Sequence, residues 1–215
     1  KSCVAGKIKN SRQVLLRGSR EAKSEADAAA LSRVADNLAA SLRALPDASD
    51  ADVVRGIEGE AARNYFAALN LIVREDLRST FQLDGRTRRP PRDRFNALLS
   101  FLYSMLMNDC RSACEAAGLD PQVGFLHVLR PGRAALALDL MEEFRPFVDR
   151  LALTLINRGQ LGEKDFTERE GGAVLLEGDA RKAVVVAYQE RKQEELTHAL
   201  LAESVPMGVL PLVQA

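Results

Sequence analysis

GFLHVLRPGRAALALDLMEEFRP, at residues 124–146, says more about the architecture and chemistry of this chain than any other stretch. It places His127, one of two histidines, shortly before a Pro-Gly break, and a run with helical apolar spacing follows. Asp139 and Glu142 lie three residues apart in that run, so they share one face of a helix. One imidazole and two carboxylates beside an Arg-Pro-Gly-Arg corner indicate a divalent-metal site that faces a polyanion.

Helical periodicity also dominates the rest of the chain, with apolar residues at steps of three and four. Pro46 restricts the residue before it and predicts the end of one helix. Ser49, with an acid three residues later, predicts the N-cap of the next helix, and Gly118 predicts a helix C-terminus. The helices expected from this pattern cover residues 2–18, 23–45, 50–72, 94–117 and about 180–202, with one more from Pro146 to about Ile156.

Two segments interrupt the helical pattern. Residues 79–93 are predicted to form a loop, because Gly85 and the Pro90-Pro91 pair break helices. The segment GGAVLLEGDARK predicts at most one small hairpin near 172–180. No internal repeat or low-complexity linker divides the chain, so the sequence predicts one mainly α-helical domain over residues 1–215.

Composition narrows the class of protein. With 47% hydrophobic and 28% charged residues the chain has the profile of an ordinary globular domain. It contains no apolar run long enough to span a bilayer, and no signal peptide. Three cysteines without zinc-finger spacing fit a reducing cytoplasm. Cys110 and Cys114, one helical turn apart, are expected to be small core residues.

The formal net charge is zero, but the charges are segregated along the sequence. Two basic blocks flank the acidic residues 24–60, and each block is typical either of a solvated face or of a basic groove beside an acidic pocket. Both interpretations remain open. The basic residues of the two blocks are Lys1, Lys7, Lys9, Arg12, Arg17, Arg20 and Lys23, and Arg86, Arg88, Arg89, Arg92 and Arg94.

A metal site for phosphodiester chemistry needs a further carboxylate, and Glu58 is the best candidate. Gly56 and Gly59 flank it within a predicted helix, where each glycine costs about 1 kcal/mol relative to alanine. That cost is tolerated where the backbone comes close to another helix or to a ligand. Two interpretations stay open: a metal-ligating glutamate, or a tightly packed glycine seam beside an exposed glutamate.

Four motifs follow one another along the chain: GIEGEAARxYF at 56–66, RxRRPPxDxxNALLSFxY at 86–103, GFLH at 124–127 and RPGRxALALDLMEEFRP at 130–146. In this order they resemble the CRISPR-associated integrase family, the Cas-one endonuclease of spacer acquisition. The resemblance runs from about Val4 to the end of the chain, and QERKQEELTH at 189–198 is similar to the subtype I-C branch.

The resemblance implies a metal-dependent DNA endonuclease and integrase. Such an enzyme inserts new spacer DNA into a CRISPR array by attack of a 3′-hydroxyl on a phosphodiester. The resemblance places Mg²⁺ or Mn²⁺ on Glu58, His127 and Glu142 as the catalytic ligands, and Asp139 as an acid that orients a ligand or a bound water. The alternative is a helical scaffold that binds DNA or proteins without catalysis. Intact ligand positions favour the enzyme.

The resemblance also implies partners. These are double-stranded DNA (the prespacer and the CRISPR repeat), a second copy in a homodimer, the small Cas-two subunit and the Cas-four nuclease. The N-terminal β-rich domain of the family is missing from this chain, which begins without a methionine. His198 is expected to be structural, and Tyr65 and Tyr103 to pack in the core. The arginines expected to bind phosphates are Arg86, Arg88, Arg89, Arg130 and Arg133.

Overall fold

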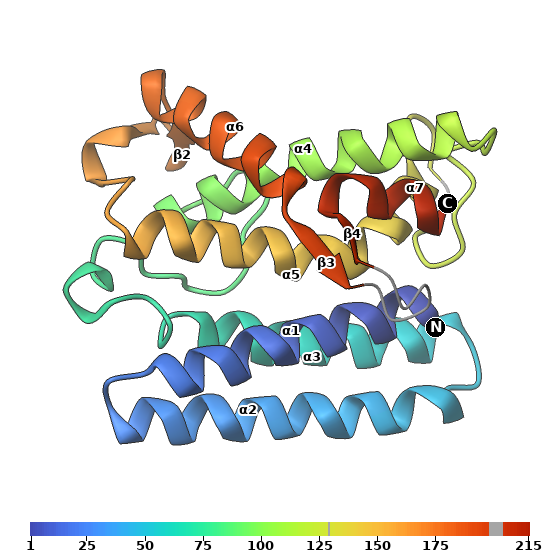
Figure 1. Cartoon of the computed structure of the whole chain (residues 1–215), viewed down its shortest axis with the longest axis horizontal. Helices are drawn as coiled ribbons and strands as arrows, with labels where there is room; N and C mark the ends of the chain where they lie inside the picture. The colour runs from blue at the N-terminus through green and yellow to red at the C-terminus, as the bar shows by residue number, and fades with distance from the viewer. Residues whose placement is uncertain (129, 198–203) are drawn as a thin grey trace.

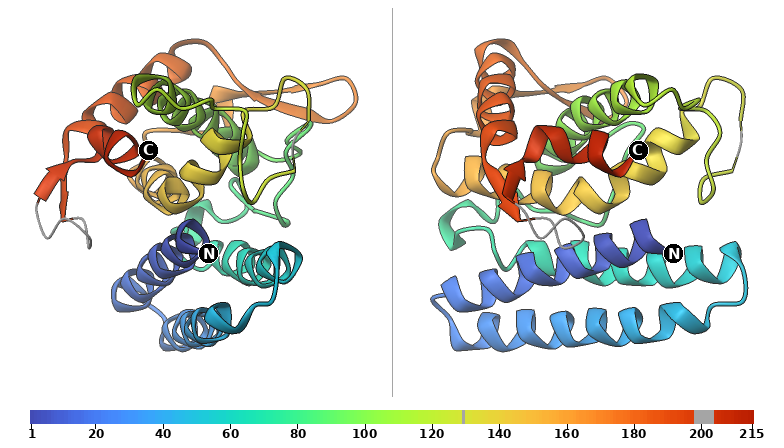
Figure 2. Two further views of the ribbon diagram at one scale, coloured as in Figure 1. Left: turned by 90° about the vertical axis from the view of Figure 1, so that its right-hand side faces the viewer. Right: turned by 45° about the vertical axis from the view of Figure 1, so that its right-hand side comes forward.

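The first three helices form the lower layer of the molecule in Figure 1. The computed structural model describes residues 1–128, 130–197 and 204–215. α1 (Ser2–Glu21) is followed by α2 (Glu25–Ala44), and a short 3₁₀ turn leads into α3 (Ala51–Leu69). Each of these helices packs against the other two, and the left view of Figure 2 shows them nearly end-on as a three-helix bundle.

Side-chain caps fix where these helices begin. The Ser24 hydroxyl accepts from the Asp27 amide at 3.4 Å at the start of α2. At the start of α3 the cap is Asp50, whose Oδ1 accepts from the amides of Asp52 and Val53 at 2.9 and 3.0 Å. The prediction of Ser49 as this cap is wrong by one residue. Its hydroxyl instead donates to Asp50 Oδ2 at 2.8 Å, which orients the capping carboxylate.

The upper layer is built around α5 (Ala135–Asn157), which packs against α1 of the lower layer. It also contacts α4 (Arg94–Ala116), α6 (Gly178–Gln193) and the short α7 (Leu210–Gln214). α4 ends as predicted, with Gly118 at φ +75°, a conformation that glycine adopts without strain. The right view of Figure 2 shows α5 between α4 and the lower layer.

α5 runs without interruption through Pro146, although the sequence predicted that a new helix begins after that proline. An internal proline removes one backbone hydrogen bond and costs about 3 kcal/mol. Burial outweighs that cost, because Met141, Phe144, Val148 and Ile156 are all at most 1% exposed. Each such side chain contributes about 1.5–3 kcal/mol on burial. The local signal of Pro146 therefore predicted two helices where tertiary packing stabilises one.

The mainly α-helical prediction is confirmed, and the strands form two small antiparallel hairpins. β1 (Phe166–Arg169) pairs with β2 (Ala173–Leu176), so this hairpin begins before the predicted 172–180, and α6 already begins at Gly178. β3 (Glu195–Thr197) pairs with β4 (Ser204–Pro206).

The second hairpin was not predicted and lies where the last long helix was expected to continue to about 202. α6 ends at Gln193, and Leu196 and Val205 from the paired strands pack against the core. Pairing between strands on either side of a connection is not visible in local helical periodicity. His198 lies outside the described residues.

The hairpin β1–β2 also braces the arginine-rich loop before α4. Its Val174 amide donates to the Pro91 carbonyl at 2.9 Å, and Arg92 Nη1 donates to the Gly171 carbonyl at 2.6 Å. Cys110 and Cys114 are both fully buried on α4, as expected of small core residues. In the part of the chain that the structure describes, no helix has the length and apolar character that a bilayer crossing needs.

Candidate active site

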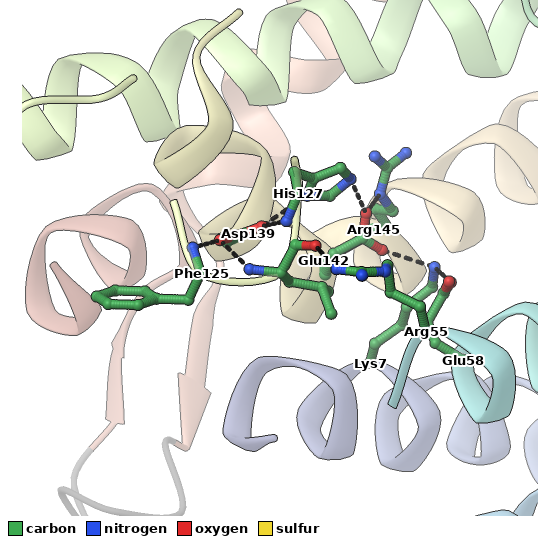
Figure 3. A network of polar contacts seen from close by, with 9 residues as sticks. Lys7, Arg55, Glu58, Phe125, His127, Asp139, Glu142 and Arg145 are labelled. Carbon is green, nitrogen blue, oxygen red and sulfur yellow. Dashed lines mark hydrogen bonds and ion pairs between the residues drawn. The ribbon is translucent and has the colours of Figure 1, made fainter. Parts of the chain in front are cut away.

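A buried lysine joins the two predicted glutamate ligands. Lys7 of α1 lies between Glu58 of α3 and Glu142 of α5, as Figure 3 shows. Its Nζ donates to Glu142 Oε2 at 2.6 Å and forms a short ion pair with Glu58 Oε1. The side chains of Lys7 and Glu142 are only 7% and 5% exposed, whereas that of Glu58 is 22% exposed. Three helices thus each supply one charged side chain to this cluster of ion pairs.

Glu142 is held as a carboxylate by two cations. Burial alone would raise its pKa, but the Arg145 guanidinium and the Lys7 ammonium outweigh this effect and lower the pKa to about 2. Arg145 Nε lies 3.0 Å from Glu142 Oε1, and the arginine is itself buried. Glu142 is therefore ionised at neutral pH and available to bind a cation.

Asp139 holds the loop that carries His127. Its Oδ2 accepts from the amides of Phe125 and Leu126 at 2.5 and 2.8 Å. Its Oδ1 accepts from the His127 amide at 3.0 Å and from His127 Nδ1 at 2.6 Å. Burial would raise the pKa of Asp139, but these hydrogen bonds, that from the imidazole above all, lower it. A carboxylate can only accept, so Nδ1 carries the proton.

Nε2 is therefore the ring nitrogen that faces Glu142. That atom lies 3.8 Å from Glu142 Oε1. The structure thus brings the predicted ligands Glu142 and His127 side by side, and Asp139 contacts the histidine as expected of an orienting acid.

Two further features fix this loop. A Cβ at Gly124 would lie 2.6 Å from the Ala135 carbonyl carbon and 2.7 Å from Asp139 Oδ2, so only glycine allows the loop to approach the start of α5. Arg55, one turn before Glu58 on α3, donates from Nη1 to the Leu126 carbonyl at 2.8 Å. α3 therefore both supplies a candidate ligand and anchors the loop that supplies another.

The donor set suits a divalent cation in chemistry and in charge. Two carboxylates and one imidazole are ligands that Mn²⁺ accepts, and Mg²⁺ accepts the carboxylates. As placed, however, no three His, Cys, Asp or Glu side chains of the described residues are grouped closely enough to hold a metal ion. Lys7 contacts both carboxylates from between them. A divalent cation and the Lys7 ammonium would therefore compete for the same oxygens.

A groove lined by arginines opens beside His127, and we call it the basic groove. Its cavity volume is about 680 Å³, and its walls contain no Asp or Glu among the described residues. Gly132, at φ +71°, forms the turn on one side of it. The groove contains the buried Arg145 and all five arginines that were expected to bind phosphates, which are Arg86, Arg88, Arg89, Arg130 and Arg133.

The five expected arginines differ in exposure and in how much of each guanidinium is already hydrogen-bonded. Arg86 donates to Asn96 Oδ1 at 2.6 Å and to Ser100 Oγ at 3.1 Å, and burial lowers its pKa. Its guanidinium is thus already used in holding the loop. Arg88, Arg89 and Arg130 are exposed, and Arg133 is half-buried. These four are better placed to contact a ligand.

Tyr65 and Tyr103 pack in the core as expected, and they also share a buried acid. Their hydroxyls donate to the two oxygens of Asp149 at 3.1 and 2.5 Å. Burial raises the pKa of Asp149 to about 6, although the two hydroxyls oppose the shift. The Arg145 guanidinium lies 4.6 Å from the centre of the Tyr103 ring. A buried polar network thus connects Glu142 to the centre of the upper layer.

The glycines beside Glu58 do not form a packing seam. Gly56 and Gly59 are exposed, and a Cβ at either position would meet nothing within 4 Å. That interpretation is wrong, and the open surface next to Glu58 leaves room for the backbone of α3 to approach a ligand.

The sequence pattern did not predict that Lys7, Arg55 and Arg145 belong to the site. A signal for Lys7 was present, because it lies three residues after Val4 and seven before Val14, on the apolar face of α1. A lysine on a buried face needs an acidic partner.

The chain resembles known proteins in sequence and in structure. The chain matches the family described as CRISPR associated protein Cas1 over residues 1–190. It is 57% identical over 216 residues to the CRISPR-associated endonuclease Cas1 1 of Moorella thermoacetica, covering 100% of this chain and 63% of that relative. The chain therefore spans less than two thirds of the length of this relative.

Two further similarities involve larger proteins. The chain is 40% identical over 215 residues to a CRISPR-associated exonuclease Cas4/endonuclease Cas1 fusion of Rhodospirillum rubrum, covering 99% of this chain and 36% of the fusion. Among solved structures it resembles a chain of a Cas6-RT-Cas1–Cas2 complex with a TM-score of 0.82 and 30% identity, covering 99% of this chain and 22% of that one.

Proposed function

The chain belongs to the CRISPR-associated Cas1 family, and on that premise we propose that it carries the catalytic centre of a metal-dependent DNA endonuclease and integrase. Its task is to insert spacer DNA into a CRISPR array during adaptation, in antiviral defence. The observation that supports the proposal best is the meeting of Glu58, Glu142 and Lys7 beside an imidazole held by Asp139. The charges alternate, are largely buried, and border a groove that attracts phosphates.

Glu58, His127 and Glu142 are the residues that would hold Mg²⁺ or Mn²⁺. A bound divalent ion would neutralise a non-bridging phosphate oxygen and lower the pKa of an attacking hydroxyl. The protein's own contribution is positioning. Asp139 accepts from Nδ1 and so orients Nε2 towards Glu142, and Arg145 keeps Glu142 ionised.

The basic groove is the binding surface for the DNA backbone in this proposal. Its walls are free of acidic side chains among the described residues, and exposed arginines lie on both sides of it. Guanidinium groups bind phosphate oxygens in pairs. DNA held there lies beside His127, where a 3′-hydroxyl attacks a phosphodiester at the edge of the repeat. Attack by water gives nuclease activity instead.

We propose the same partners that the family resemblance implied. One relative is a fusion named for Cas4, and one similar structure is a complex named for Cas2. By analogy this chain acts with a Cas2 subunit and with a Cas4 nuclease. We also propose that it acts as a homodimer on prespacer and repeat DNA.

A strand-transfer assay with Mn²⁺ and a duplex containing a repeat junction tests the proposal. Glu58→Gln and His127→Ala should each lower strand transfer by on the order of 100-fold or more. Glu60→Gln is the matched control, because Glu60 is an exposed glutamate two residues from Glu58 on the same helix. Equal transfer by parent and ligand variants would contradict the proposed centre. DNA binding by a parent without any transfer would favour the non-catalytic scaffold.

A further inference from the structure

A second cluster of arginines lies away from the candidate active site, towards the C-terminal ends of α1 and α5. It surrounds a cavity of about 360 Å³ that we call the arginine pocket. Arg150 lies eight residues beyond Glu142 on α5, which is about 12 Å along the helix. The arginines that line this pocket are Arg17, Arg150, Arg158 and Arg191. The proposed DNA chemistry uses none of them.

Arg191 of α6 is buried without enough acceptors. Its side chain is 9% exposed, and its Nη1 forms a short ion pair with Glu194. Its Nε and Nη2 are fully buried and have no hydrogen-bond partner among the described residues. Buried donors in proteins nearly always have an acceptor. Arg191 also lines the arginine pocket, so a turn of its guanidinium would present these two buried donors to an acceptor that enters there.

The neighbouring guanidinium groups also lack counter-charge. Burial and the proximity of Arg17 lower the pKa of Arg150, and burial together with Arg150 and Arg17 lowers the pKa of Arg191. Four arginines face two glutamates, Glu21 and Glu194, so two positive charges are left in the pocket. Within the described residues, neither Arg150 nor Arg158 forms an ion pair. An anion that enters the pocket would relieve this repulsion.

The walls of the arginine pocket distinguish one kind of anion from another. The basic groove has no acidic side chain on its described walls, as a DNA backbone requires. The arginine pocket instead has two glutamates on its lining, which would repel neighbouring phosphates of a polyanion. Apolar side chains lie among its charges: Val14, Ile72, Leu151 and Leu153. This mixture suits one carboxylate with apolar residues on either side of it.

We propose that the arginine pocket binds a glutamate or aspartate side chain, flanked by apolar residues, from a partner protein. The carboxylate accepts from Nε and Nη2 of Arg191 in the two-bond geometry that guanidinium and carboxylate groups favour. Arg150 and Arg158 contribute charge from the side of α5, and the flanking apolar residues contact Val14 and Ile72. The pocket is thus a docking site for protein, independent of the proposed active site.

Blocked peptides test the proposal directly. The probe is acetyl-Leu-Ala-Glu-Ala-Leu-amide, and its control carries Gln in place of Glu. Binding to the full chain is followed by NMR of the arginine Nε–Hε signals, with the Arg191 signal assigned from Arg191→Lys. The Glu peptide should shift that signal and bind about tenfold more tightly than the Gln peptide, or better. The double variant Arg150→Gln/Arg158→Gln should lose the preference, and Arg33→Gln, an exposed arginine of α2, should keep it.

Three outcomes would overturn the proposal. The first is equal affinity for both peptides, or no binding of either. The second is inorganic phosphate binding as tightly as the Glu peptide, which would make this a site for free anions. The third is a short DNA duplex that shifts the Arg191 signal and depends on Arg150, which would extend the DNA surface to this face. If Arg191→Lys does not fold, the peptide affinities of the parent and of the Arg150→Gln/Arg158→Gln variant still test the proposal.

Discussion

Replacing Lys7 by methionine is the most informative single change. The substitution keeps the aliphatic part of the side chain and removes the ammonium group that lies between Glu58 and Glu142. Without metal, two carboxylates then lose a shared counter-charge in a largely buried setting. Removing one partner of a buried pair costs about 3–5 kcal/mol. Arg145 still neutralises Glu142, so we expect a loss of about 2–4 kcal/mol in the free energy of unfolding.

Mn²⁺ should offset part of this loss in stability. The ion no longer competes with an ammonium group for the same oxygens. Two unit charges 4 Å apart interact by about 4 kcal/mol at an effective dielectric of 20. In the parent, Lys7 can turn away and recover most of that energy. We therefore expect the variant to bind Mn²⁺ at least about tenfold more tightly, which is about 1.4 kcal/mol of additional stabilisation by the metal.

Acid unfolding is a second test of the Lys7→Met variant. The folded-state pKa of Glu142 is about 2, below its ordinary value of 4.5. Its ionised form therefore stabilises the fold above pH 4.5, and this contribution is lost as the pH falls from 4.5 towards 2. Lys7 is one of the two cations that hold the pKa down, so its removal should shift acid unfolding to higher pH.

The assay is urea unfolding followed by the far-ultraviolet circular dichroism of the helices, with and without Mn²⁺. The control is Lys9→Met, an exposed lysine on the same helix. Two results would refute the reasoning. One is a difference below about 0.5 kcal/mol between the two variants without metal. The other is an equal gain in stability from Mn²⁺ in the Lys7 variant and the parent.

Three further predictions concern residues around the site. The pKa of Asp149 is about 6 in the folded protein and 3.8 in its ordinary state, so the folded protein holds this proton more tightly. The parent should therefore lose about 2–3 kcal/mol in the free energy of unfolding as the pH rises from 3.8 to 6, and Asp149→Asn should not. Unfolding measured at several pH values checks this. Gly59→Ala should raise the stability of α3 by about 0.5–1 kcal/mol, seen as a higher melting temperature, since the added methyl meets open space. Gly124→Ala should push the His127 loop away from α5 and lower strand transfer by about 10- to 100-fold with duplex binding unchanged, which a binding titration beside the activity assay measures. A stable, fully active Gly124→Ala protein would contradict this account of the loop.

Most of the fold was predictable because its signals are local. Amphipathic spacing located α1 to α4, and Gly118 marked the end of α4. The predictions were wrong where contacts between residues far apart in the sequence determine the secondary structure. Pro146 is a local signal for a break, but packing on several sides keeps α5 in one piece. The strands β3 and β4 depend on each other, so neither is visible alone.

The candidate site was predictable for a different reason. Glu58, His127 and Glu142 stood out because they lie in three of the four ordered motifs, not because of their spacing alone. Lys7 did not stand out, because its partners are 51 and 135 residues away in the sequence. Only folding shows that a residue from the first basic block is placed among the acids.

Pro146 has a consequence for Glu142 beyond the continuity of α5. Proline has no amide hydrogen, and the carbonyl it would have bonded in an α-helix is the one four residues earlier, that of Glu142. The carbonyl of this candidate ligand therefore has no helical partner, whereas its amide still has one in Leu138. The helix is held less tightly at Glu142 than at its neighbours. In the proposed function, the carboxylate that exchanges a lysine for a metal ion stands on this less constrained turn.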